Sequence, residues 1–291
     1  MEQWPNFFIV GTAKAGTTTL HEYLKKIPEI YMSPLKEPNY FALEKIPENY
    51  FRKPIRSKEK YFSLFNNVKK QRIIGESSVN YLADSKAPKL IHQVSPNAHI
   101  LISLRDPVER VYSEYFMHRR GGHLNPIFLE QIKFELNNQI DYSKHNIGLT
   151  KGLYSEYVKR YFSLFGKNKV KIIIFEEFIK HQKQTVEEIL EFLGIPHSLT
   201  MFDEEAHRSF SVPRNRLFQL ILGNITIINS AAKFLPQSSR TYLREQFLVT
   251  KKPKPKMDED ARKILINYYK EDVEKLKHLL DRKLPWENFS N

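Results

Sequence analysis

The chain has 291 residues, no cysteine and a net charge of +13, from 46 Lys plus Arg against 33 Asp plus Glu. The length fits one domain, and 41% hydrophobic with 27% charged residues is ordinary for a globular chain, which excludes a disordered or collagen-like protein. Without cysteine there is no disulfide scaffold, thiolate metal site or cysteine nucleophile. The positive charge favours polyanionic partners, such as nucleic acid, acidic membranes or sulfated and phosphorylated ligands.

No pattern in the sequence predicts membrane insertion. The stretch Met1–Val10 lacks a basic region followed by a long apolar run, so no signal peptide is expected. The longest uncharged stretch, Leu217–Ala232, is interrupted by polar residues and is a poor membrane span. With no cysteine to suggest an oxidising compartment, we expect a cytoplasmic protein without a transmembrane segment, although an anchor upstream remains open.

Short apolar runs alternate with helical patterns along the chain. This alternation predicts a single α/β domain with a central parallel sheet flanked by helices, and ligands at the carboxyl ends of the strands. The expected strands are Asn6–Gly11, Arg72–Gly75, His99–Leu104 and Val170–Phe175, and the expected helices are Thr17–Lys26, Gln184–Leu193 and Asp258–Asp281. Residues 125–143 are expected to be helical within a lid at about 120–145.

The segment Gly11-Thr-Ala-Lys-Ala-Gly-Thr-Thr18 follows the first strand and has the glycine spacing of a phosphate-binding loop. In such a loop, backbone N–H groups and a helix N-terminus surround an anion. Nucleotide triphosphatases place a lysine directly after the second glycine, where this chain has Thr17 and carries Lys14 inside the loop instead. A lone glycine-rich turn is often only a turn, but Lys14 and the threonines Thr17–Thr19 favour phosphate binding here.

A second informative stretch runs from Leu101 to Ser113. Arg105 ends an apolar strand, and Ser113 lies about two turns into the helix that Asp106-Pro107 begins, so both side chains can reach one anion. Taken alone, the stretch favours a plainer interpretation. In that interpretation Arg105 pairs with Asp106 or Glu109, and Ser113 merely packs.

Together the two stretches resemble the sulfotransferases that use 3′-phosphoadenosine 5′-phosphosulfate (PAPS). Phe7–Leu24 is similar to their 5′-phosphosulfate loop, and Leu104–Ser113 is similar to their 3′-phosphate motif. The most similar subgroup is the heparan-sulfate-type sulfotransferases and their bacterial relatives. The resemblance spans nearly the whole chain and continues through Lys36–Phe41, Gly75–Leu82, Gly152–Tyr154 and the loop Lys251–Lys256.

The resemblance implies a role for each matching residue. Lys14 would bind between the 5′-phosphate and the sulfonate and neutralise charge on the leaving phosphate. Arg105 and Ser113 would bind the 3′-phosphate. The remaining residues implied to contact the nucleotide are Ala15, Gly16, Thr17, Thr18, Thr19, Tyr154, Lys251 and Lys252. No metal is expected, because side-chain cations take the place of magnesium.

Glu37 matches the catalytic base of the heparan-type subgroup, in the sequence Lys36-Glu-Pro-Asn-Tyr-Phe41. A carboxylate near the sulfonate would accept the proton of an attacking hydroxyl or amine. Two alternatives stay open. Glu37 can be a surface residue paired with Lys36 or another lysine, or a histidine can be the base, for which His118 and His123 are the candidates.

The chain departs from the heparan-type pattern at two places. Ser77 stands where that subgroup usually has a lysine, and the subgroup's C-terminal disulfide is impossible here, which favours a bacterial-type cytosolic enzyme. Two prolines stiffen the loop Lys251–Lys256. We expect this loop to close over PAPS, with Lys251 and Lys252 nearest the phosphates; a solvated linker is the alternative.

The resulting hypothesis is a sulfotransferase that moves a sulfonate from PAPS to a hydroxyl or amine and releases adenosine 3′,5′-bisphosphate. The acceptor would be a glycan, a small molecule or a lipid, and no nucleic-acid partner is expected. One alternative is a P-loop small-molecule kinase, against which stand Thr17 in the lysine position and the lack of an obvious magnesium-binding aspartate. The other is a non-enzymatic binder of polyanions or nucleic acid, suggested by the charge of +13.

Overall fold

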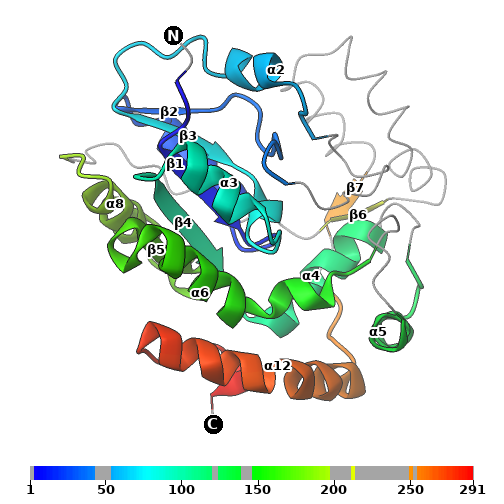
Figure 1. The fold of residues 1–291 in the computed structure, drawn as a ribbon. Coiled ribbons are helices and arrows are strands. Elements are labelled where there is room, and N and C mark those ends of the chain that lie inside the picture. The colour runs from blue at the N-terminus through cyan, green and yellow to red at the C-terminus, as the bar shows by residue number, and fades with distance from the viewer. Residues whose placement is uncertain are drawn as a thin grey trace.

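A five-stranded parallel sheet forms the centre of the molecule, with strand order β2-β3-β1-β4-β5 (Figure 1). The structure, a computed structural model, describes residues 3–42, 54–119, 124–138, 146–196, 211–213, 249–251 and 254–290. The strands of the sheet are β1 Phe7–Gly11, β2 Ile30–Met32, β3 Ile73–Ser77, β4 His99–Leu104 and β5 Val170–Ile174. A separate antiparallel pair joins β6 Ser211–Pro213 to β7 Val249–Lys251. The predicted α/β class is confirmed.

Strand β1 lies in the middle of the sheet, paired with β3 through Phe7 and Gly75 and with β4 through Phe7 and His99. All five of its residues are buried, as expected for a strand covered on both faces. The chain crosses from β3 on one side of β1 to β4 on the other. The loop after β1 therefore lies at a switch point of the strand order, where open α/β sheets bind ligands.

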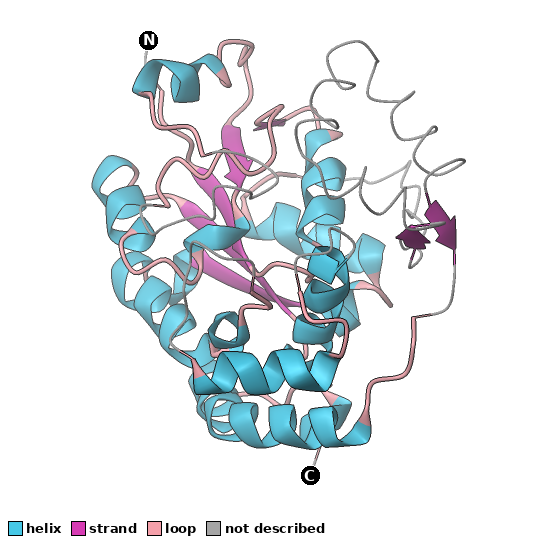
Figure 2. Ribbon diagram, turned by 90° about the vertical axis from the view of Figure 1, so that its right-hand side faces the viewer, coloured by secondary structure: helices cyan, strands magenta, loops and turns pink. Residues whose placement is uncertain are grey.

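Helices cover both faces of the sheet (Figures 1 and 2). On one face Phe7 and Ile9 pack with side chains of α1 and α8, and on the other Phe8 and Val10 join the larger cluster that includes α3, α4, α6 and α12. The helices are α1 Thr17–Lys25, α2 Lys58–Ser63, α3 Ala87–Val94, α4 Pro107–Arg119, α5 Phe128–Asn137, α6 Tyr154–Phe165, α7 Phe175–Phe178, α8 Gln182–Phe192 and α12 Glu259–Leu280. Short 3-10 turns are η1 Val79–Tyr81, η2 Leu149–Gly152, η3 Lys167–Lys169 and η5 Glu287–Phe289.

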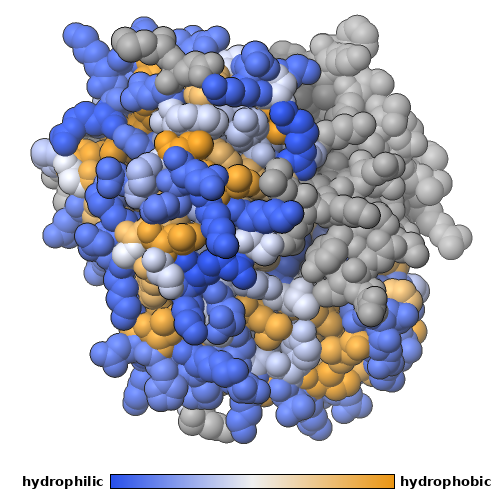
Figure 3. All heavy atoms as spheres, viewed as in Figure 1, coloured by the Kyte–Doolittle hydropathy of each residue, from blue (hydrophilic) through white to orange (hydrophobic). Residues whose placement is uncertain are grey.

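The segment predicted as a lid contains helix α5, which packs against α4 where Phe128 meets the rings of Tyr112 and Tyr115. Its outer side carries both apolar and charged side chains: Phe134 exposes 59% of its surface, as does Ile127 just before the helix, and Lys133 pairs with Glu130 beside them. Figure 3 shows apolar side chains in several patches on this face, one of them at the lower right near α5. Residues 120–123 and 139–145 of this segment lie outside the described residues, so the lid itself stays a prediction.

A carboxyl group is completely buried near the carboxyl end of β3. Glu76 accepts hydrogen bonds from the hydroxyls of Tyr61 and Tyr81, both at 2.8 Å, and from Ser78 Oγ at 2.7 Å. Burial raises the pKa of Glu76 to about 7, although the three hydroxyl donors lower it in part. The folded protein therefore holds a proton on Glu76 more tightly than the unfolded chain does.

We expect Glu76 to make the protein more stable in mild acid than in mild alkali. Its stabilising contribution is complete below the unfolded pKa of about 4.3 and is lost as the pH rises through about 7. From pH 8 to pH 5, the free energy of unfolding of the wild type should rise by roughly 2–3 kcal/mol relative to that of Glu76→Gln. Urea unfolding of both proteins at the two pH values measures this, and a difference that does not change with pH would contradict it.

Candidate functional site

The loop between β1 and α1 is held in one conformation by backbone geometry and by β4. Gly16 has a φ of +76°, and a Cβ atom there would lie 3.1 Å from the ring of Phe175, so a larger residue would strain the backbone and crowd this ring. Thr12 N–H donates to the carbonyl of Ser103 at 2.6 Å, and Ser103 Oγ donates to the carbonyl of the buried Ala15 at 2.5 Å. Two hydrogen bonds to β4 therefore fix the loop at both ends.

The start of α1 presents free backbone donors next to this loop. Leu20 N–H bonds back to the carbonyl of Gly16 at 3.1 Å, and no described residue accepts from the amides of Thr17, Thr18 and Thr19 before it. No side chain caps the helix at Gly16. Unsatisfied amides and the positive end of the helix dipole together favour an anion at this position.

Arg105, from the end of β4, lies directly against the loop. Its Nη1 donates to the carbonyl of Lys14 at 3.0 Å, and its guanidinium stacks 4.6 Å from the ring centroid of Phe175. Burial lowers the pKa of Arg105, while Glu176 and Glu109 act in the opposite direction. Its buried Nε atom has no hydrogen-bond partner among the described residues. Among the described residues Arg105 forms no ion pair with Asp106 or Glu109, and its guanidinium bonds to the main chain of Lys14 instead. Whether Ser113 merely packs or binds ligand stays open.

Helix α4 carries Ser113 on the face that Lys14 approaches. Ser113 is partly exposed, one helical turn before Met117, and the two share a face of α4. The Nζ atom of Lys14 lies 3.7 Å from Met117 Sδ, so the lysine reaches toward this face. Lys14 thus reaches the face of α4 that carries Ser113, and Arg105 bonds to the main chain of Lys14. That Arg105 and Ser113 bind one phosphate together stays a prediction.

Tyr154 contacts the main chain next to the candidate site. Its ring is fully buried, and its hydroxyl donates to the carbonyl of Arg105 at 3.0 Å. In this structure Tyr154 supports the main chain of Arg105. A direct contact between Tyr154 and a nucleotide stays a prediction.

Glu37 lies at the carboxyl edge of the sheet, beside the end of β3. Its N–H donates to the carbonyl of Ser77 at 2.8 Å, and Ser77 is followed by Ser78, whose N–H donates to the carbonyl of Ile9 at 3.0 Å in β1. Glu37 has a φ of +64°, in the left-handed region that non-glycine residues seldom occupy. Residues with such strained backbones are often found at functional sites. Its side chain is 21% exposed and pairs with Lys36 Nζ at 2.8 Å. The expected pair with Lys36 is therefore present, but both side chains are partly buried and do not form an open surface pair.

Ser77, which replaces the lysine of the heparan-type pattern, points into the protein. Its side chain is fully buried, and its Oγ lies 2.8 Å from Nδ1 of the buried His21 in α1. Ser77 therefore links β3 to α1 and adds no charge near Glu37.

His118 belongs to a buried ionic group within α4. Its Nε2 lies 3.6 Å from Glu114 Oε1, and Glu114 Oε2 accepts from Arg110 Nη1 at 2.6 Å. Although burial acts to raise it, the hydrogen bond with His118 and the charge of Arg110 lower the pKa of Glu114 to about 2. This position is a poor one for a histidine that must meet an acceptor. His123, the other candidate, lies outside the described residues.

The basic loop before α12 runs along α4. Tyr112 OH bonds to the carbonyls of Pro255 and Lys256, each at 3.1 Å. Lys254 Nζ lies 4.3 Å from the centroid of the Tyr112 ring and 3.1 Å from Glu109 Oε2. Although burial acts to raise it, the charge of Lys254 brings the pKa of Glu109 below its ordinary value.

Lys254 and Arg262, which lies 3.4 Å from Glu109 Oε1, were not predicted as site residues. The lysine-rich loop Lys251–Lys256 could have indicated Lys254, but the prediction named Lys251 and Lys252 from it. Lys251 ends strand β7, and Lys252 lies outside the described residues, so their expected place near the phosphates is untested.

The model of the sulfotransferase domain family matches residues 5–278. The chain belongs to the sulfotransferase family. A sulfotransferase from Alicyclobacillus acidocaldarius has a similar solved structure, with a TM-score of 0.70 and 29% identity, and the match covers 97% of this chain and 98% of that one. The resemblance found in the sequence is confirmed.

Curated relatives include sulfotransferases of carbohydrates. Human carbohydrate sulfotransferase 15 is 27% identical over 245 residues, which are 66% of this chain and 44% of that protein. Mouse bifunctional heparan sulfate N-deacetylase/N-sulfotransferase 4 is 26% identical over 292 residues, covering 97% of this chain and 31% of that protein. The chain thus spans less than half the length of these relatives.

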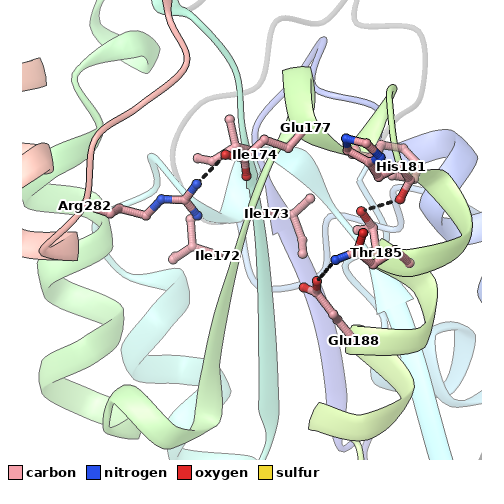
Figure 4. A pocket seen from close by; sticks show the side chains of 10 residues that line it. Ile172, Ile173, Ile174, Glu177, His181, Thr185, Glu188 and Arg282 are labelled. Carbon is pink, nitrogen blue, oxygen red and sulfur yellow. Dashed lines mark hydrogen bonds and ion pairs between the residues drawn. The ribbon is translucent and has the colours of Figure 1, made fainter.

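The remaining observations on the described residues concern membrane spans, metal sites and a surface hollow. In the ranges that the structure describes, no helix is long and apolar enough to cross a membrane, and no three His, Asp or Glu side chains are grouped to hold a metal ion. A hollow of about 380 Å³ lies along the edge strand β5, between α8 and Arg282 (Figure 4). None of the predicted site residues lines this hollow.

Proposed function

We propose that this sulfotransferase takes a sulfonate from PAPS and gives it to a hydroxyl or amine acceptor, with adenosine 3′,5′-bisphosphate as the second product. One observation carries the proposal. The hydrogen bond from Arg105 Nη1 to the carbonyl of Lys14, at 3.0 Å, joins the loop after β1 to the end of β4. A nucleotide with phosphates at both its 5′ and 3′ positions needs two neighbouring anion sites. This bond brings the loop, which would bind the 5′-phosphate, next to Arg105, which would bind the 3′-phosphate.

The 5′ side of the nucleotide would lie at the start of α1. The amides of Thr17–Thr19, which have no acceptor among the described residues, would donate to the 5′-phosphate. Lys14 would supply a positive charge that stabilises the leaving phosphate. On the 3′ side, Arg105 offers a guanidinium with an unused Nε atom, and Ser113 offers a hydroxyl from α4. Lys254 adds a cation to this side, and we propose that the loop up to Lys256 closes over the nucleotide.

In the transfer step, the acceptor oxygen or nitrogen forms a bond to sulfur while the bond from sulfur to the 5′-phosphate oxygen breaks. Glu37 would accept the acceptor's proton, and the electron pair of the broken bond stays on the phosphate beside Lys14. The left-handed backbone of Glu37 and its hydrogen bond to Ser77 support this role, because they hold the carboxylate at the carboxyl edge of the sheet.

We propose a glycan as the first acceptor class to test and a small molecule or lipid as the second. The net charge of +13 favours an acidic acceptor, and two relatives carry carbohydrate or heparan sulfate in their names. Transfer of labelled sulfonate from PAPS to a panel of acceptors tests the reaction. Thermal shifts with adenosine 3′,5′-bisphosphate but not with ATP and magnesium would distinguish this enzyme from a kinase.

Replacing Arg105 with alanine should remove the preference for a 3′-phosphate. We expect about a 30- to 100-fold weaker affinity for adenosine 3′,5′-bisphosphate, with little change for adenosine 5′-phosphate, since hydrogen bonds between charged groups are worth about 2–3 kcal/mol. Calorimetry with both nucleotides measures the ratio. Arg72→Ala is the matched control, because Arg72 is exposed just before β3, at the opposite edge of the sheet. Equal losses for both nucleotides would make Arg105 a structural residue.

A further inference from the structure

The C-terminal tail, residues 281–290, folds back from α12 against the turn that carries Arg105. It lies beyond the family match, which ends at residue 278. Three apolar side chains anchor the tail: Trp286 is fully buried, and Leu284 and Phe289 are 6% and 7% exposed. The tail is therefore a packed part of the molecule, although its sequence lies outside the matched family pattern.

The first link from the tail runs through helix α7, which directly follows β5. Trp286 Nε1 donates to Glu176 Oε2 at 3.0 Å, and the other oxygen of Glu176 accepts from the N–H of Asp106 at 3.1 Å. An ion pair between Arg282 and Glu177 fastens the start of the tail to the same helix (Figure 4). Glu176 thus connects the indole of Trp286 to the backbone next to Arg105.

The second link runs through Asn288, which uses both ends of its amide. Its Nδ2 donates to Asp106 Oδ2 at 2.8 Å, while Asp106 Oδ1 accepts from Val108 N–H at 2.9 Å at the start of α4. Its Oδ1 accepts from Arg262 at 2.7 Å, and Arg262 also reaches Glu109. Asn288 therefore joins the turn before α4 to the charged group that holds Lys254.

These contacts give hydrogen-bond donors to the carboxylates of Asp106 and Glu176, which are largely buried. Burial raises the pKa of Asp106 and of Glu176, and the hydrogen bonds from Asn288 and Trp286 act against that shift. Without the tail, each carboxylate would lose a donor while remaining largely enclosed, and an unsatisfied buried acid tends to move or to take up a proton. Either change would disturb the turn between β4 and α4.

We propose that Trp286 and Asn288 are positioning residues of the 3′-phosphate site. They hold the Arg105-Asp106 turn so that the guanidinium of Arg105 faces the nucleotide, and neither of them touches the nucleotide itself. This role rests on the proposed function, in which Arg105 binds the 3′-phosphate.

The test compares Asn288→Ala and Trp286→Phe with the wild type by calorimetry, using adenosine 3′,5′-bisphosphate and adenosine 5′-phosphate. We expect affinity for the bisphosphate to fall about tenfold in each variant, as for one lost hydrogen bond to a charged group, and affinity for adenosine 5′-phosphate to change less than about twofold. Glu287→Gln is the matched control, since Glu287 is the exposed neighbour of both residues. A purely structural role would lower the melting temperature and weaken both nucleotides alike, which would overturn the proposal.

A double variant separates this role from a general effect. In the Arg105→Ala background, adding Asn288→Ala should cost no further affinity for the bisphosphate, because the guanidinium that it positions is gone. A full additional loss would overturn the proposal. Asn288 is partly exposed, so its variant keeps the test open if Trp286→Phe does not fold. If the wild type itself does not prefer the bisphosphate, the proposed function is wrong and this role falls with it.

Discussion

Replacing Lys14 with alanine is expected to reduce turnover with PAPS by roughly 30- to 1,000-fold, which corresponds to about 2–4 kcal/mol of transition-state stabilisation. Lys14 is the only cation in the loop Gly11–Thr18. Negative charge develops on the 5′-phosphate as its bond to sulfur breaks, so a neighbouring ammonium contributes more in the transition state than in the ground state. The loop should keep its shape in the variant, because Arg105 bonds to the carbonyl of Lys14 and not to its side chain.

Steady-state kinetics with PAPS measure this effect, and two further variants make the result specific. Lys25→Ala removes the same charge from the exposed far end of α1 and should leave turnover unchanged. Lys14→Arg keeps the charge but changes its shape and hydration, so it should fall between the wild type and Lys14→Ala. Near-normal turnover in a folded Lys14→Ala protein would contradict the assignment.

The central elements of the fold could be predicted because their residues are buried on all sides. β1 and β4 are apolar runs followed by glycine or by Asp106-Pro107, and their observed bounds differ from the prediction by at most one residue. Strand β2 was missed because its three residues are too few to show a periodic pattern. Ile30 belongs to a strand only through its pairing with Ile73, which the local sequence does not indicate. Helix α6 was missed for another reason. Its buried residues have helical spacing, but Tyr154, Val158 and other aromatic or β-branched residues do not favour a helix over a strand.

Some residues of the candidate site could likewise be predicted from the sequence, and others could not. Lys14 and Arg105 lie in local motifs, whose spacing is visible in the sequence. Lys254 and Asn288 reach the site only through the fold, since Asn288 bonds to Asp106 across 182 residues and Lys254 bonds to Glu109 across 145. No local pattern records such a contact. The position of Tyr154 shows a further limit, because a motif indicates that a residue is near a site but not which of its neighbours its hydroxyl will bond.

Replacing Glu37 with glutamine is expected to reduce sulfonate transfer by roughly 100-fold or more, with affinity for adenosine 3′,5′-bisphosphate unchanged. The substitution keeps the size of the side chain and removes its basicity. The hydrogen bond that places residue 37 comes from its backbone N–H to Ser77, so the variant should retain the left-handed turn. A loss confined to transfer would then report the missing proton acceptor and not a displaced loop.

The measurement pairs transfer of labelled sulfonate from PAPS with calorimetry of nucleotide binding. Glu29→Gln is the matched control, because Glu29 is exposed just before β2, away from the carboxyl edge where Glu37 lies. If a folded Glu37→Gln protein transfers sulfonate at the normal rate, the base is another residue. His123 would be substituted before His118 in that case, because Glu114 already lies 3.6 Å from His118 in the interior of the protein.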